Sequence, residues 1–145
     1  MPVTGAADDR PDLGAMLMRL GRLLLAVEQP ILQAHDISMW GYAVLTALRD
    51  EPMRAQAALA RSIGADKTRI IAILDELQER GLIEREADPA DRRVRLLRLT
   101  TTGGSLQRRV QTEIRAAEAT LLDQLTPADR RAFLGALQTL DPAAG

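Results

Sequence analysis

The segment 91–100 most constrains what this chain can fold into. Leu97 and Leu99 stand at the two-residue spacing of a β-strand with one buried face. Residues 82–86 are a second short strand by composition, and the intervening residues 88–91, Asp-Pro-Ala-Asp, have the composition of a turn. These residues predict a β-hairpin in a chain whose other segments show helical periodicity.

Two helices are predicted before this region. Residues 13–33 carry a wide apolar stripe at helical spacing, and Pro30 either kinks this helix or marks its last turn. A break at 36–38 follows, where Ser38 can cap a second helix over 39–49.

Residues 55–81 predict two further helices joined by a tight turn at 63–65. Asp66 is positioned to cap the second helix, and Gly81 ends it. The apolar residues of the second helix follow the i, i+3, i+4, i+7 pattern of a core-facing stripe: Ile70, Ile73, Leu74 and Leu77. A hairpin directly after such a helix pair is a winged helix-turn-helix arrangement.

The C-terminal part predicts a long helix from Thr102 to about Leu125, then a helix with Thr126 as its cap and Pro127 at its first position. The fold class is therefore mainly α with a small β-hairpin wing. We expect four regions: a disordered tail (1–12), N-terminal helices for dimerisation and a pocket (13–50), a winged DNA-binding lobe (51–101) and C-terminal dimerisation helices (102–141).

Composition excludes several classes of function. The 145 residues include no cysteine and a single histidine, His35, so disulfides, thiolate metal sites and a dedicated transition-metal site are not expected. There is no cofactor motif, and Gly103-Gly104 is an isolated pair rather than a phosphate-binding loop, which argues against an enzyme. No apolar run spans a bilayer and no signal peptide is present, so a cytoplasmic location is expected.

The basic residues are unevenly distributed. The net charge is −1, but residues 54–98 hold ten basic and eight acidic side chains, and four arginines without an acid lie within 92–98. Local field decides whether a patch attracts phosphate, so this segment predicts an anionic partner, with nucleic acid as the first candidate.

The start of the second helix of the pair supplies the candidate base-reading residues. Lys67, Thr68 and Arg69 can donate to bases or phosphates, and the small Ala72 lets the helix lie deep in the groove. Arg54 stands beside the poorly capped start of the preceding helix, where free N–H groups suit a phosphate. The alternative is that these cations are merely solvated.

The hairpin tip supplies a second candidate contact. Arg92 and Arg93 outnumber the nearby acids, which favours minor-groove or phosphate contact over solvation or pairing with Asp88 and Asp91. Asp91 is expected to steady the turn, and Leu97 and Leu99 to anchor the hairpin on the core. Arg95 and Arg98 rank lower because their strand positions point them along or away from the lobe.

The wing residues resemble those of the MarR family of bacterial transcriptional regulators. The family pattern Asp-x-Arg-x-x-x-Leu-x-Leu-Thr followed by glycine is matched by Asp91, Arg93, Leu97, Leu99, Thr100 and either Gly103 or Gly104. Upstream, the helix-turn-helix and the strand after it are matched by Leu59-Ala60, Gly64, Leu77 and Gly81-Leu82-Ile83-Glu84-Arg85.

The resemblance implies a homodimer whose first, fifth and sixth helices intertwine and whose two lobes bind a pseudopalindromic double-stranded operator. It implies that Arg93 is the minor-groove arginine and that repression is relieved by a small, often phenolic or anionic, effector. Wide apolar stripes on the first and last helices independently favour a dimer.

The candidate effector pocket consists of His35, Trp40 and Tyr42, because two aromatic residues with polar handles can stack a planar ligand. The alternative is that the aromatic pair belongs to the core and His35 to a surface loop. A different class of function also stays open: a winged-helix module that binds an acidic protein partner without sequence-specific DNA binding.

Overall fold

The computed structural model describes residues 8–52 and 54–142. Its elements, in order, are α1 (Leu13–Ala34), α2 (Met39–Asp50), β1 (Arg54–Ala55), α3 (Gln56–Ile63), α4 (Lys67–Glu79), β2 (Ile83–Ala87), β3 (Arg95–Leu99), α5 (Thr101–Leu122) and α6 (Pro127–Leu140). The predicted class, mainly helical with a hairpin wing, is confirmed. Residues 1–7 of the expected N-terminal tail lie outside the described residues, and 8–12 precede α1 without helical structure.

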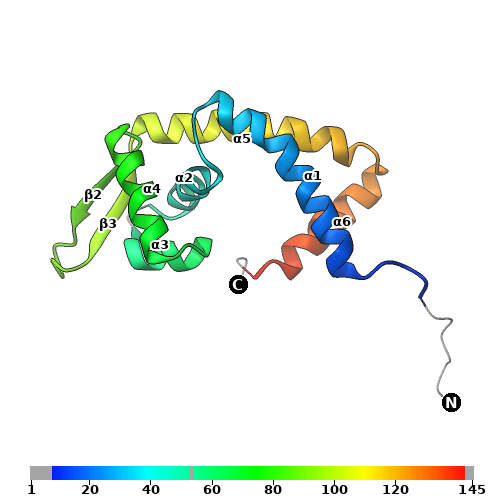
Figure 1. Ribbon diagram of the computed structural model, residues 1–145, viewed down its shortest axis with the longest axis horizontal. Coiled ribbons are helices and arrows are strands. Elements are labelled where there is room, and N and C mark those ends of the chain that lie inside the picture. Colours follow the sequence, from blue (N-terminus) through cyan, green and yellow to red (C-terminus); the bar gives the residue numbers. More distant parts are fainter. Residues whose placement is uncertain (1–7, 53, 143–145) are drawn as a thin grey trace, which may run out of the picture.

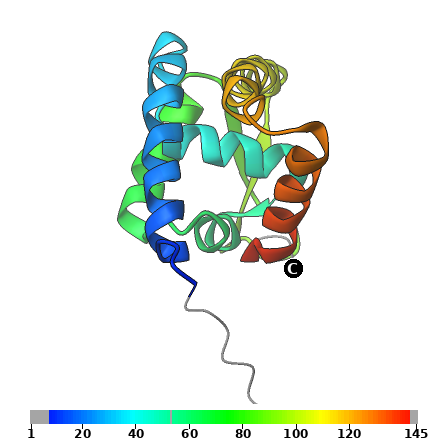
Figure 2. The same cartoon turned by 90° about the vertical axis from the view of Figure 1, so that its right-hand side faces the viewer.

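The long helix α5 connects two parts of the molecule. Figure 1 shows a lobe of α2, α3, α4 and the β-hairpin at one end of α5, with α1 and α6 toward the other end. In the view turned by 90°, α1 and α6, which overlap in Figure 1, lie on opposite sides (Figure 2). The described helices include none that is long and apolar enough to cross a membrane.

The hydrophobic core lies mainly in the lobe. Helix α2 contributes Val44, Leu45 and Leu48, all fully buried, and α4 contributes the stripe of Ile70, Leu74 and Leu77 predicted from its periodicity. Burying leucine-sized side chains contributes about 1.5–3 kcal/mol each, so this cluster fixes the orientation of α4 relative to α2.

The sheet has three strands in the order β1-β3-β2, with all pairings antiparallel. Leu97 of the central strand is fully buried, and Leu99 packs half-buried against the core. The two-residue strand β1, in which Arg54 is opposite Leu97, was not predicted. Two residues are too short to show a periodic pattern, so only the tertiary pairing reveals this strand.

The predicted caps of three helices are confirmed. The Ser38 hydroxyl accepts from the Gly41 N–H at 3.0 Å, Asp66 accepts from Arg69 N–H at 2.7 Å, and Thr126 caps α6. The start of α5 lies one residue earlier than predicted, because Thr100 is its cap and accepts from the Gly103 N–H. Helix α1 continues through Pro30 to Ala34.

Candidate nucleic-acid interface

The first turn of α4 presents its polar side chains outward. Ile70 and Leu74 are buried against the lobe, which leaves Lys67, Thr68 and Arg69 exposed on the other side. Ala72, one turn further on, is also exposed. The Asp66 cap fixes the backbone of this turn, so the three side chains project from a rigid helix end.

Helix α3 begins without a side-chain cap. Its N-cap residue is Ala55, whose methyl group accepts no hydrogen bond, so N–H groups of the first turn stay available for an anion. The pairing of β1 with β3 ties this helix start to the base of the wing. The Arg54 backbone lies in β1, while its side chain lies outside the described part of the structure.

Two aspartates hold the tip of the wing. Asp88 accepts from the Ala90 N–H at 2.9 Å, and Asp91 accepts from the Arg93 N–H at 3.1 Å. Backbone bonds between Val94 and both aspartates close the turn. The Arg93 side chain is 92% exposed, with its Nε 3.3 Å from the Asp91 carboxylate, and Arg92 is exposed beside it. The tip is thus an ordered turn that presents two arginines to solvent.

A hollow of about 810 Å³ lies between the wing and the α3–α4 pair. Its lining includes Gln56 at the start of α3, Lys67 and Ile71 of α4, and Arg93 of the wing. The structure therefore brings the uncapped helix start, the first turn of α4 and the wing to one surface, although they are separated along the chain.

Two of the other wing arginines are paired with acidic or polar side chains of the lobe. Arg98 donates to Glu84, its partner in the strand register, at 2.5 Å, and this hydrogen bond raises the pKa of Arg98. Arg85 joins β2 to Asp75 and Gln78 of α4. Arg95, by contrast, is exposed at the start of β3 and lines the same hollow as Lys67 and Arg93, so the structure places it nearer the candidate surface than its strand position indicated.

Trp40 lies beside α4 rather than in a common site with Tyr42. The Arg69 Cζ atom lies over the indole ring, 5.5 Å from its centroid. A hollow of about 480 Å³ at this point is lined by Trp40, Thr68, Arg69 and Ala72, among others. Sequence reasoning missed this placement, although residues two apart on a helix point in different directions.

His35 and Tyr42 lie apart from Trp40. The His35 ring, at the end of α1, is 2.5 Å from the Glu113 carboxylate of α5. Tyr42 lines another hollow of about 480 Å³, formed with α5 and α6, and burial raises its pKa. The structure does not bring the three predicted effector residues together, because the two aromatic residues line separate hollows.

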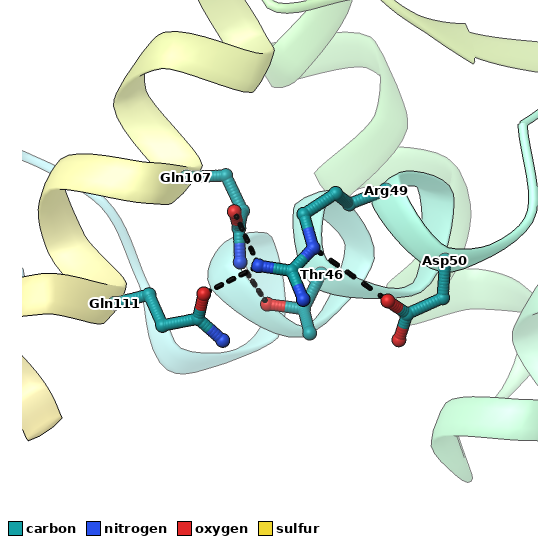
Figure 3. Close-up of polar contacts among 5 residues, drawn as sticks. All are labelled: Thr46, Arg49, Asp50, Gln107 and Gln111. Carbon is teal, nitrogen blue, oxygen red and sulfur yellow. Dashed lines mark hydrogen bonds and ion pairs between the residues drawn. The ribbon is translucent and has the colours of Figure 1, made fainter.

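A polar cluster around the buried Gln107 joins the lobe to α5 (Figure 3). Gln107 of α5 is fully buried and donates to the Thr46 hydroxyl at 3.3 Å. The Arg49 guanidinium donates to Gln107 at 3.5 Å and to Gln111, and its Nε is 3.6 Å from Asp50. Since leaving a buried amide unpaired costs about 1–3 kcal/mol, this cluster favours one seating of α2 on α5.

The fold and surface define a winged helix-turn-helix DNA-binding protein. Residues 35–94 match the model of the MarR family. An HTH-type transcriptional repressor of Mycobacterium tuberculosis, Rv2887, is 30% identical over 136 residues, which cover 94% of this chain and 97% of the relative. The chain belongs to the MarR family, and the resemblance seen in its wing residues is confirmed. Its members are transcriptional regulators, so the chain is a DNA-binding regulator and not an enzyme.

Solved structures agree with this assignment. The complex of M. tuberculosis Rv2887 with DNA matches with a TM-score of 0.78 and 26% identity, covering 91% of this chain and 99% of that one. CouR from Rhodococcus jostii RHA1, bound to p-coumaroyl-CoA, matches with a TM-score of 0.76 and 28% identity, covering 96% and 97%. Relatives of this fold thus bind a duplex in one case and a small ligand in the other.

Proposed function

We propose that this protein is a homodimeric repressor that binds a pseudopalindromic operator and is released by a small ligand. The observation that carries the proposal is the shared hollow of Lys67 and Arg93, since it sets a helix start and an arginine-bearing wing on one surface. A helix start of this kind suits the major groove, and arginine suits a narrow minor groove. Such a repressor works in the cytoplasm, beside the chromosome.

The candidate contacts divide by chemistry. Lys67, Thr68 and Arg69 contact base edges, and Ala72 permits close approach of α4. Arg92 and Arg93 enter the minor groove or contact phosphate, while Arg54 binds the backbone near the uncapped start of α3. Asp91, Leu97 and Leu99 support the wing from its turn and from the core. In this scheme residues 51–101 bind DNA, and residues 102–141 form the C-terminal dimer arm. Residues 13–50 serve dimerisation through α1 and the pocket through α2, which packs in the lobe.

DNA binding is tested with a fluorescent duplex from upstream of the chain's own gene. Fluorescence anisotropy is expected to give binding that survives unrelated competitor DNA and weakens steeply with added salt, because counterions are released from phosphates. Absence of binding to any duplex at low salt would contradict the proposal and favour the protein-partner alternative.

The dimer is supported by apolar surface that this chain leaves uncovered. Helix α6 has no buried residue, and its leucines are exposed, with Leu140 at 73%. Leu13, Leu17 and Met18 of α1 are exposed as well. Apolar helix faces of this extent are typical of association, and a second copy with the same stripes is the simplest partner that covers them.

Replacing Leu137 by arginine is expected to convert the dimer to a monomer, because the change sets a charge in the apolar interface at a cost of several kcal/mol. Size-exclusion chromatography with light scattering measures the mass. Thr139→Arg is the control, since helical spacing sets Thr139 on the opposite face of α6, where it is exposed. A monomeric wild type, or a dimeric Leu137→Arg protein, would contradict the proposed dimer.

A small aromatic or anionic effector is proposed for the hollow that Tyr42 lines. This hollow offers the Tyr42 ring and the cation Arg115, while its Arg130 is paired with Asp123 at 2.9 Å and the carboxylates Glu118 and Asp141 also line it. The ring suits an aromatic ligand, and Arg115 is the cation that an acidic group on such a ligand would use. It lies between α2 of the lobe and the helices α5 and α6. A ligand there can favour a spacing of the two α4 helices other than the roughly 34–36 Å that successive major grooves require.

A further inference from the structure

Trp40 and Arg69 form a contact between α2 and the first turn of α4. The Arg69 Cζ atom lies over the Trp40 ring at 5.5 Å from the centroid, within the range of a cation–π interaction. Trp40 is half-buried near the start of α2, two residues after the Ser38 cap, so the indole is held by a fixed helix end. Arg69 is exposed on the outer side of α4.

Three arginines of the wing are held differently. Arg85, Arg93 and Arg98 each lie against a carboxylate, which occupies some of their N–H donors. Within residues 8–52 and 54–142, no carboxylate lies within ion-pair distance of the Arg69 guanidinium, which lies instead over the indole ring of Trp40. An aromatic ring contacts the face of a guanidinium and leaves the donors at its edge available, because those donors lie in the guanidinium plane.

We propose that Trp40 is a positioning residue for base recognition: it holds the guanidinium of Arg69 so that its edge reads a guanine in the major groove. The proposal rests on the DNA-binding function proposed above and adds a residue outside the helix-turn-helix to the reading of sequence. Arginine binds guanine O6 and N7 through two parallel N–H groups, which requires a fixed orientation.

The surroundings of the pair fit this role. Thr68 and Ala72 of α4 line the same hollow as Trp40 and Arg69, and neither side chain is long enough to fill it. A base edge can therefore approach Arg69 along α4. An arginine without the indole would lose its rotamer freedom on binding DNA, and the ring reduces this entropic cost because it restricts Arg69 beforehand.

The experiment is selection of bound duplexes from a randomised pool by the full-length protein, followed by sequencing. Four variants are compared with the wild type: Trp40→Leu, Trp40→Phe, Arg69→Ala and the double variant Trp40→Leu/Arg69→Ala. Leucine retains apolar packing between α2 and α4 but removes the aromatic face, and phenylalanine retains an aromatic face. Thermal unfolding followed by circular dichroism shows that each variant is folded.

We expect the wild type to select a symmetric motif that contains a preferred guanine. In Arg69→Ala the preference for guanine over the other bases at that position should fall roughly tenfold. Trp40→Leu should relax the same position, Trp40→Phe should restore most of the preference, and the double variant should add no further loss. A role in packing alone would instead lower affinity for all duplexes equally.

Two results would overturn the inference, and only the second of them would also overturn the proposed function. A wild-type motif that Trp40→Leu leaves intact, or weakens equally at every position, removes the positioning role but keeps the proposed function. A wild-type selection without base preference at any position removes both the sequence-specific function and the role of Trp40.

Discussion

Replacing Gly103 by alanine is expected to cost at least about 3 kcal/mol of the free energy of unfolding, more than most changes in this chain. A Cβ atom there would lie 1.9 Å from the Leu82 carbonyl oxygen and 2.8 Å from its carbon. The backbone on both sides is fixed, because that carbonyl accepts from the Thr100 N–H at 3.1 Å and the Gly103 N–H donates to the Thr100 hydroxyl. Relief of the clash must separate the start of β2 from α5.

Gly104 is the matched control for this prediction. A Cβ atom at Gly104 meets only the flexible end of Arg108, at 3.5 Å, so alanine fits there. Gly104→Ala is expected to leave stability unchanged or to raise it by about 0.5–1 kcal/mol, because alanine is the better helix former. Urea unfolding followed by circular dichroism, at one protein concentration for all variants, measures both changes. Equal unfolding midpoints for the two variants would contradict the close approach at Gly103.

This pair of glycines illustrates what local pattern can and cannot determine. The family resemblance left Gly103 and Gly104 equivalent, because both follow Thr100 at the start of the same helix. The structure separates them through the backbone of Leu82, a contact between segments about twenty residues apart. The reason for a glycine at such a position is therefore visible only after the chain has folded.

The helices themselves followed from sequence because their signals are local. Asp66 and Thr126 accept the hydrogen bonds expected of caps, and the apolar residues of α4 that recur at helical spacing are buried. The hairpin followed from the spacing of Leu97 and Leu99 and from the turn before them. Caps, periodicity and turn composition depend on a few neighbouring residues, so they can be predicted from the local sequence.

The features that sequence reasoning missed all depend on tertiary contacts. Strand β1 exists because Arg54 and Ala55 pair with β3, and Gln107 is buried because α2 covers it. Trp40 was grouped with Tyr42 by proximity along the chain, whereas the helix directs the two rings to different hollows. The separation of Trp40 from Tyr42 is the exception among these features, since helical periodicity alone directs residues two apart to different sides of a helix.

Replacing Arg93 by alanine is expected to weaken operator binding by a dimer about 2–3 kcal/mol, which is roughly 30- to 150-fold, while fold and dimer persist. Each dimer loses two wing contacts, and a charge-assisted hydrogen bond contributes about 1.5 kcal/mol or more. The Arg93 side chain is almost fully exposed, so removing it leaves no cavity. Its pairing with Asp91 does not oppose DNA binding strongly, since exposed ion pairs contribute only about 0–1 kcal/mol.

Arg98→Ala is the control that separates a wing contact from general loss of positive charge. It removes the same charge from the same hairpin, but Arg98 is paired with Glu84 on a strand rather than presented at the tip. Fluorescence anisotropy over a range of salt should show a large loss of affinity and a shallower salt dependence for Arg93→Ala, and a small loss for Arg98→Ala. If Arg93 contacts DNA directly, its removal must weaken binding more than removal of Arg98. Equal losses of affinity in the two variants would therefore contradict a direct contact and mean that the wing acts through its overall positive charge.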